Sequence, residues 1–119
     1  MKLALTLLLP LLLPAPLLAA DAEHGRQLFL QCAACHGDHG QGSENAPPLI
    51  GILGRAAGSN EEFRYSPAMK RSAIVWDEAA LQAFATDPQS KVKGTRMPFD
   101  GLKNPGDAAD VVEYVKGLK

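Results

Sequence analysis

The stretch Cys32-Ala33-Ala34-Cys35-His36 contains both cysteines of this 119-residue chain and a histidine directly after the second. C-x-x-C-H is the spacing that attaches a c-type haem. Thiols one helical turn apart can each form a thioether to one of the two vinyl groups along one edge of the macrocycle, and the next residue then places an imidazole under the iron. The motif therefore predicts covalent attachment at Cys32 and Cys35, with His36 as the proximal ligand.

Two other chemistries use a C-x-x-C pair. A redox-active disulfide of the thioredoxin type is expected beside a βαβ pattern, and the sequence shows none. A structural zinc site needs four ligands, and neither a second C-x-x-C nor a pair of histidines follows. Haem attachment accounts for the motif better than either alternative.

The N-terminus has the pattern of a secretory signal peptide. Lys2 is followed by an almost purely apolar run over residues 3–20, and the first acidic residue is Asp21. A short basic start, an apolar run and small residues at its end are typical of a signal that is cleaved on export. Because covalent haem attachment normally occurs outside the cytoplasm, the sequence predicts a bacterial periplasmic protein.

The end of the signal is less sharply defined. Cleavage after Ala20 or after Ala22 fits the small residues, and we take 1–20 as the signal and 21–119 as the mature domain. An uncleaved membrane anchor is the alternative. Stable membrane insertion is not expected, because three prolines interrupt the apolar run: Pro10, Pro14 and Pro16.

The mature chain has 99 of the 119 residues, which is enough for one small domain. Loss of Lys2 changes the formal net charge from −1 to −2. A slightly acidic chain gives no reason to expect nucleic acid or an anionic membrane as a partner.

Helical periods and turn-rich gaps alternate along the mature chain. Gly25, Leu28, Phe29 and Cys32 recur at helical spacing, so we expect a first helix that leads into the cysteine motif. Residues 37–58 are rich in glycine and show little periodicity. Such a long loop is usually functional or wrapped around something.

Two further helices carry clear end signals. Asp77 is a candidate N-cap for a short helix that ends before Pro88, and its periodic residues are Ala80, Leu81, Phe84 and Ala85. Asn104 and Pro105 are the N-cap and first position of a last helix, whose apolar face comprises Ala108, Val111, Val112, Val115 and Leu118. Since no strand pattern is convincing, we predict an all-α domain with long loops.

A closed iron site needs a sixth ligand. The candidates, besides several lysines, are Met69, Met97, His24 and His39. Gly94 and Pro98 flank Met97 and favour a preset loop that is neither helix nor strand. A lone methionine can also fill a gap in a core. The loop context favours Met97 as a thioether ligand, which raises the reduction potential.

The other candidates have simpler interpretations. Met69 follows Ser66-Pro67-Ala68 and is interpreted as a packing residue. His24 is expected on the surface of the first helix, and His39 in a solvated loop. Trp76 fits a core position, where its indole N–H needs a partner if it is buried.

Taken together, these features resemble the class I cytochromes c, in particular their soluble mitochondrial and photosynthetic-bacterial branch. The resemblance extends from Gly25 to Leu118. Besides the haem motif, it is carried in order by Pro47-Pro48-Leu49-Ile50-Gly51, Leu53-Gly54-Arg55, Phe63-Arg64-Tyr65-Ser66, Trp76, Asp87-Pro88 and Gly94-Thr95-Arg96-Met97. It implies a small cytochrome c fold, whose helices and long loops wrap around one covalently bound haem c.

The resemblance also implies roles for individual residues. Cys32 and Cys35 match the thioether positions, and His36 and Met97 match the axial ligands. Pro47 matches a proline whose carbonyl accepts the imidazole Nδ1–H. The residues that match those around the haem propionates are Arg55, Tyr65 and Trp76. A first-helix pair, Gly25 and Phe29, matches residues that pack on the last helix against Val111 and Tyr114.

The chain also departs from the family pattern. Phe84 replaces a tyrosine beside the methionine ligand, which removes a hydroxyl hydrogen bond near the sulfur. Ile50 replaces a histidine that bridges two loops, and Asp87 replaces a helix-ending asparagine. Met69 replaces a polar residue that orders an internal water. Most of the family's lysine ring is missing.

The expected function is one-electron transfer by a periplasmic monohaem carrier that is monomeric and is not an enzyme. Redox protein partners would dock transiently at the haem edge. Four cations bracket the Met97 loop and form either a docking ring or an ordinary solvated face: Lys91, Lys93, Arg96 and Lys103. The alternatives are a haem enzyme or gas sensor with a labile sixth ligand, a dedicated cytochrome subunit of a periplasmic dehydrogenase, and a haem-free thiol protein.

Overall fold

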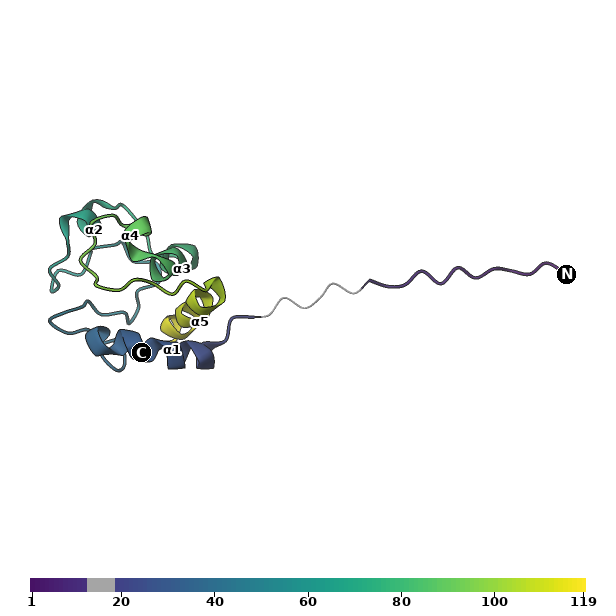
Figure 1. Cartoon of the computed structure of the whole chain (residues 1–119), viewed down its shortest axis with the longest axis horizontal. Coiled ribbons are helices and arrows are strands. Elements are labelled where there is room, and N and C mark those ends of the chain that lie inside the picture. The colour runs from purple at the N-terminus through teal and green to yellow at the C-terminus, as the bar shows by residue number, and fades with distance from the viewer. Residues whose placement is uncertain (13–18) are drawn as a thin grey trace.

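The computed structural model describes residues 1–12 and 19–119 (Figure 1). Five helices follow one another along the chain: α1 Ala22–His36, α2 Pro67–Arg71, α3 Glu78–Thr86, α4 Pro88–Lys91 and α5 Pro105–Lys116. In the described ranges the only strand-like pairing is an isolated antiparallel bridge between Ala56 and Val75. The prediction of an all-α domain with long loops is therefore confirmed.

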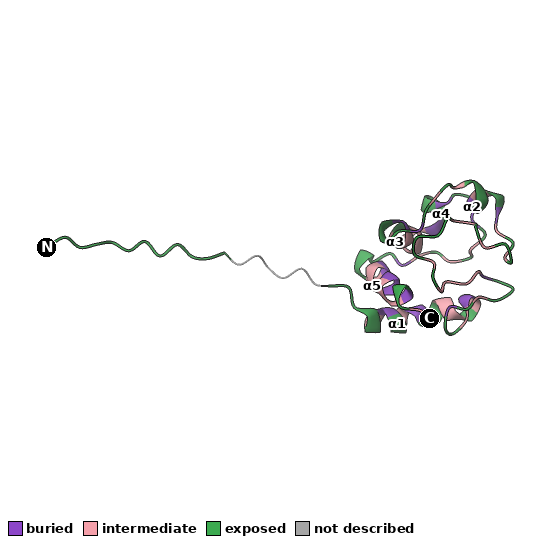
Figure 2. Ribbon diagram, turned by 180° about the vertical axis from the view of Figure 1, so that it is seen from behind, coloured by how far each residue is buried: buried purple, intermediate pink, exposed green. Residues whose placement is uncertain are grey.

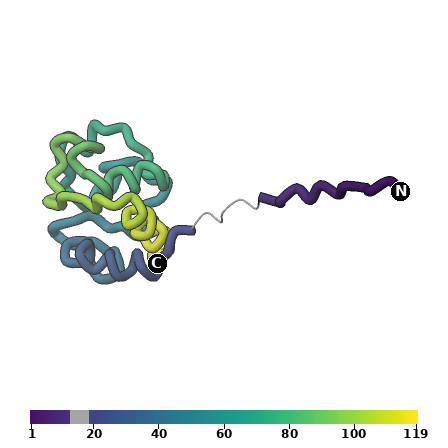
Figure 3. The backbone as a smooth tube through the Cα atoms, turned by 45° about the vertical axis from the view of Figure 1, so that its right-hand side comes forward, coloured from purple at the N-terminus to yellow at the C-terminus, as the bar shows by residue number. Residues whose placement is uncertain are grey.

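The N-terminal segment lies apart from the helical domain. Residues 1–12 are exposed and extended, and the tube in Figure 3 shows them leading away from the folded part. Within the described residues, no helix is both long and apolar enough to span a bilayer. Pro14 and Pro16, on which the expectation of no stable membrane insertion partly rests, lie outside the described residues. Cleavage of this segment stays a prediction.

The helix α1 begins where the predicted mature chain begins. The Asp21 side chain accepts hydrogen bonds from the backbone N–H groups of Glu23 and His24 at 3.0 and 3.1 Å, which is the geometry of an N-cap. The backbone N–H of Asp21 also donates to Oδ1 of Asp110 on α5 at 2.7 Å. Asp21 therefore fixes the start of α1 and ties it to α5.

The first and last helices cross in close contact. Gly25 allows this contact, because a Cβ at its position would lie 1.9 Å from the carbonyl oxygen of Asp110. One turn later the rings of Phe29 and Tyr114 pack with their centroids 5.1 Å apart. A buried cluster surrounds this contact and comprises Phe29, Leu102, Ala108, Val111 and Val115. The helix pairing implied by the family resemblance is present.

The three shorter helices form the other half of the domain. Asp77 caps α3 as predicted, with its carboxylate accepting from the N–H of Ala80 at 2.7 Å. Asp87 ends α3 and at once caps α4, so Pro88 opens a further helix rather than a loop. The short α2, which the sequence did not predict, starts from a Ser66 cap. Together they enclose a second buried cluster of Met69, Trp76, Ala80 and Val92.

The two clusters lie in different halves of the domain. Figure 2 shows buried residues along the facing sides of α1 and α5, and others among α2, α3 and α4, with loops bridging the two halves. Residues 37–58 contain no helix, as predicted for the glycine-rich segment, and form part of this bridge. Ile52 packs against both clusters.

A pH-dependent contact joins α1 to α5 through His24. The hydrogen bond that His24 Nδ1 donates to the Asp110 carboxylate at 2.7 Å raises the pKa of His24 above its usual 6.5. The charges of Asp110, Asp107 and Asp21 add to this rise, while desolvation opposes it. A histidine whose pKa is higher in the folded than in the unfolded protein stabilises the fold. The stabilisation is fully present at pH values below the pKa of the unfolded state, and it is lost as pH rises through the pKa of the folded state.

We therefore expect His24→Gln to lower the free energy of unfolding more at about pH 5.5 than at about pH 9. Guanidinium unfolding of the two proteins at both pH values measures the difference. An equal loss at the two pH values would contradict a charged His24 in the folded state.

Candidate functional site

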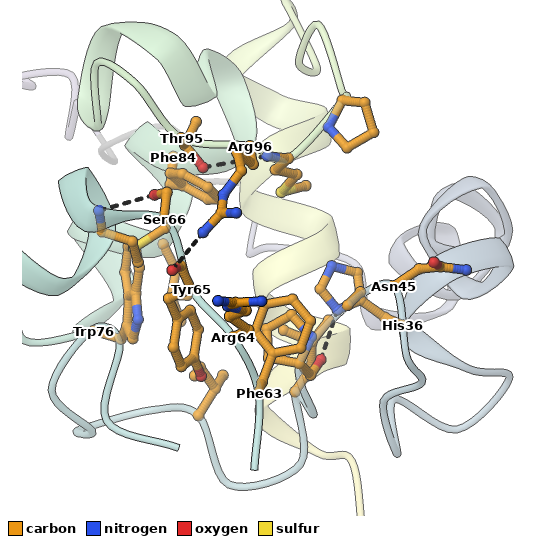
Figure 4. A pocket seen from close by; sticks show the side chains of 18 residues that line it. His36, Asn45, Phe63, Arg64, Tyr65, Ser66, Trp76, Phe84, Thr95 and Arg96 are labelled. Carbon is orange, nitrogen blue, oxygen red and sulfur yellow. Dashed lines mark hydrogen bonds between the residues drawn. The ribbon is translucent and has the colours of Figure 1, made fainter. Parts of the chain in front are cut away.

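A pocket lies between the two buried clusters and encloses about 860 Å³, including the part that is open to solvent. Five of the eight site residues predicted from the sequence line it: His36, Pro47, Tyr65, Trp76 and Met97. In Figure 4, His36 lies across the pocket from Tyr65 and Trp76. The pocket therefore brings together residues from α1 and from three separate loops.

Three of the predicted site residues are not among the lining side chains. Cys32 and Cys35 lie on the last turns of α1, half-buried and unpaired, next to the lining residue His36. Arg55 is exposed on the loop that contacts Trp76, whose backbone N–H donates to the Arg55 carbonyl at 2.9 Å. Its positive charge is close enough to oppose in part the rise that burial causes in the pKa of Tyr65.

His36 is presented with one ring nitrogen free. Its Nδ1 lies 2.8 Å from the carbonyl oxygen of Pro47 and donates to it, so Nε2 carries the lone pair. Burial lowers the pKa of His36, and the Pro47 hydrogen bond opposes this shift only in part. A neutral imidazole with a fixed tautomer is the form that binds a metal ion.

The loop after α1 holds His36 in this orientation. The last carbonyls of a helix lack partners within the helix. Here the carbonyl of Cys35 accepts from the Ser43 hydroxyl at 2.6 Å, and that of His36 accepts from the Gly42 N–H at 2.7 Å. Gly37 makes the turn out of the helix with a φ of +89°. The chain therefore folds back under α1 and brings Pro47 to the imidazole.

The surroundings of the two cysteines disfavour the other chemistries considered. Burial, with Cys35 nearby, raises the pKa of the Cys32 thiol to about 11, so the free thiol stays protonated. Among the described residues, the one group of side chains arranged to hold a metal ion is His24, Asp107 and Asp110, which contains no cysteine. A zinc site at the motif therefore lacks its remaining ligands in the described part of the chain.

Another part of the pocket wall is formed around Met97. The Met97 N–H donates to the Thr95 hydroxyl at 3.4 Å, and Arg96 donates to the Tyr65 carbonyl at 2.6 Å. Apolar side chains complete this wall: Met69, Trp76, Leu81 and Phe84. Met69 is 8% exposed and belongs to the second cluster, as its interpretation as a packing residue predicted. The Met97 side of the pocket is therefore dominated by apolar groups.

Polar groups gather at one end of the pocket. Burial raises the pKa of Tyr65, against the opposing effects of the Asn60 backbone and the Arg55 charge. Trp76 is 5% exposed, and its indole N–H makes no hydrogen bond among the described residues. No fully buried side-chain nitrogen in that part of the chain lacks a partner, so this N–H is at least partly accessible on a side chain that lines the pocket. Such an N–H suits an acidic group of a ligand.

Arg64 also lines the pocket, although the sequence reasoning gave it no role. Its position within Phe63-Arg64-Tyr65-Ser66, next to an expected pocket residue, was the available signal. An arginine there adds positive charge beside Tyr65.

These features fit a c-type haem. The chain offers two thiols one helical turn apart, a neutral imidazole with a free Nε2, and a thioether on a loop that lines the same pocket. Apolar walls suit the macrocycle, while the free indole N–H and nearby arginines suit its propionates. Both the donor atoms and the lining of the pocket therefore fit a c-type haem.

The comparisons with known proteins point the same way. The family model for cytochrome c matches residues 22–119. Cytochrome c2 of Rhodoblastus acidophilus is 44% identical over 103 residues, covering 85% of this chain and 95% of that protein. Cytochrome c of Tetrahymena pyriformis is 46% identical over 99 residues, covering 82% and 89%.

The solved structures include a similar fold. Cytochrome cH from Methylobacterium extorquens superposes with a TM-score of 0.76 at 36% identity, and the match covers 82% of this chain and 98% of that one. Fold, site and sequence thus agree over essentially the whole helical domain. The chain belongs to the cytochrome c family, and it is an electron-carrying cytochrome with one covalently bound haem c.

Proposed function

We propose that the protein is a periplasmic one-electron carrier whose iron is held by His36 and Met97. The observation that carries the proposal is that these two side chains line one pocket, and that Pro47 leaves Nε2 of His36 free. Cys32 and Cys35 are the proposed thioether positions. The bound haem c supplies an iron that alternates between the ferric and ferrous states.

The protein's contribution is to keep the site closed and nearly unchanged during electron transfer. The Pro47 carbonyl holds the imidazole in one orientation, and the Arg96 side chain ties the Met97 loop to the opposite loop. Met69, Trp76 and Phe84 exclude water from the Met97 side. A thioether in apolar surroundings favours the ferrous state and therefore a high reduction potential.

We propose transient docking of redox partners at the exposed edge of the site, by a monomer. Lys91 and Lys93, which precede the Met97 loop in the chain, are exposed, and no ion pair engages them among the described residues. The other two cations near the Met97 loop have partners: Arg96 binds the Tyr65 carbonyl and Lys103 lies 4.0 Å from Asp87. With so few free cations, attraction to an acidic partner is weak, which suits brief encounters.

We propose export through a signal peptide that ends at Ala20. The basic start and apolar run support export. Cleavage after Ala20 would retain Asp21, which caps α1 and whose backbone nitrogen contacts Asp110, and these contacts support this cleavage point. Cleavage after Ala22 would remove both contacts. The intact mass of the exported protein distinguishes a chain that starts at Asp21 from one that starts at Glu23.

Absorption spectra of the protein matured in a bacterial periplasm test the function. We expect one haem per chain, a low-spin c-type spectrum with the weak far-red band of ferric sulfur ligation, and no change when carbon monoxide is added to the reduced form. A high-spin spectrum or ready binding of carbon monoxide would contradict Met97 ligation and favour a haem enzyme or gas sensor. Copurification of a stable dehydrogenase would favour a dedicated subunit.

A further inference from the structure

The side chain of Gln89, on α4, reaches the loop that carries Met97. Its Nε2 donates to the Thr95 carbonyl at 2.8 Å, and its Oε1 accepts from the Gly94 N–H at 3.2 Å. One amide group thus satisfies a donor and an acceptor of two consecutive residues. Because one partner is a carbonyl and the other an N–H, only this orientation of the amide makes both bonds.

The groups that Gln89 holds lie directly before Met97. Thr95 is 8% exposed, and its hydroxyl accepts the Met97 N–H at 3.4 Å. Gly94 has a φ of +96°, which is a conformation that residues with a side chain rarely adopt. The loop is therefore held in an unusual shape at the point where Gln89 contacts it.

The short helix α4, which carries Gln89, is held in place at both of its ends. Asp87 caps α4 through the Ser90 N–H at 3.2 Å and the Ser90 hydroxyl at 2.7 Å. The turn after α4 is closed by the N–H of Val92, which donates to the Pro88 carbonyl at 2.9 Å. Val92 belongs to the buried core. Movement of the Met97 loop therefore breaks the Gln89 bonds rather than carrying α4 with it.

We infer that Gln89 is a positioning residue for Met97. Through its hydrogen bonds to Gly94 and Thr95, Gln89 keeps the ligand loop closed. The inference rests on the proposed ligation by Met97. An external ligand reaches the iron only when the loop opens, so its apparent affinity is proportional to the population of the open state. Loss of the two Gln89 hydrogen bonds raises the population of the open state, and this raises the apparent affinity for the external ligand.

The test compares Gln89→Leu with wild type and with Gln27→Leu, all as ferric holoproteins at neutral pH. Gln27 is exposed on α1 and makes no side-chain hydrogen bond among the described residues, so it controls for the change of residue type. Titration with imidazole, followed by loss of the far-red band, gives the Kd. We expect about a five- to tenfold lower Kd in Gln89→Leu, which is the effect of one to two ordinary hydrogen bonds. Gln27→Leu should match wild type.

Hydrogen exchange of the Gly94 amide gives a second readout that does not depend on an added ligand. Its exchange should accelerate in Gln89→Leu by a similar factor. Gln89→Glu, which keeps an acceptor for the Gly94 N–H but loses the donor to the Thr95 carbonyl, should also lower the imidazole Kd. If Gln89→Leu does not fold, Gln89→Glu serves as the test variant in its place.

The outcomes separate the two proposals. If wild type has the far-red band but the variants keep its imidazole Kd and its Gly94 exchange rate, the role of Gln89 is overturned and the carrier function stands. If wild type lacks the far-red band, ligation by Met97 is wrong and the inference falls with it. An equal effect of Gln27→Leu would also overturn the specific role of Gln89.

Discussion

Met97→Leu yields a protein that keeps its covalent haem but loses the far-red band and binds carbon monoxide when reduced. Leucine fills a similar volume and has no donor atom, so under the proposed ligation His36 is left as the one protein ligand at the iron. Loss of the thioether removes a ligand that favours the ferrous state, and we expect the reduction potential to fall by about 0.1–0.3 V, within the roughly 0.8 V range set by axial ligands. Spectra and a redox titration measure both effects.

Met69→Leu is the matched control for this substitution. Met69 lines the same pocket and is 8% exposed, but it belongs to the second buried cluster. We expect its replacement to keep the far-red band and to leave the reduced protein closed to carbon monoxide. Loss of the band in Met69→Leu, or its survival in Met97→Leu, would assign the sixth ligand to the wrong methionine.

Gly25→Val is expected to have the largest effect on stability, a loss of about 3 kcal/mol or more in the free energy of unfolding. A Cβ at this position would lie 1.9 Å from the oxygen and 2.5 Å from the carbon of the Asp110 carbonyl. Backbone atoms cannot rotate aside as a flexible side chain can. Relief of the overlap must separate α1 from α5 and weaken the Phe29–Tyr114 contact. Guanidinium unfolding of the holoprotein measures the loss.

Gly117→Ala is the control for the loss of a glycine. Gly117 has a φ of −91°, and a Cβ there would meet its nearest neighbour, the Tyr114 carbonyl oxygen, at an ordinary 3.6 Å. We expect its replacement to change the free energy of unfolding by less than about 1 kcal/mol. Similar losses in the two variants would mean that glycine flexibility, and not the helix contact, sets the stability.

The longer helices were predictable because their ends and faces are encoded locally. Asp77 and Asn104 are caps with side chains that accept from the helix N–H groups, as their residue types suggest. The helices α2 and α4 have only five and four residues, too few to show a period. Pro88 lies just beyond the end of α3, as predicted, but it is also the first residue of α4, which no local pattern indicated.

The site was predictable where a motif or the family resemblance names the residue. His36 and Pro47 meet as expected, and Met97 lines the same pocket. The parts that escaped prediction depend on loops folding back on one another. Arg64 enters the pocket and Gln89 reaches Gly94 only because of the paths of these loops, which no local pattern of glycines and polar residues specifies.

The division of the interior into two clusters bears on how the protein is assembled. One cluster lies between α1 and α5, the other among α2, α3 and α4, and among the described residues Ile52 packs against both. Each cluster alone is small for a stable core. We therefore expect the polypeptide to stay largely unfolded until the cofactor joins its two halves. Under the proposed export, a chain in that state can be threaded across the membrane and still offer both thiols to the attachment machinery, so that folding becomes the last step of maturation.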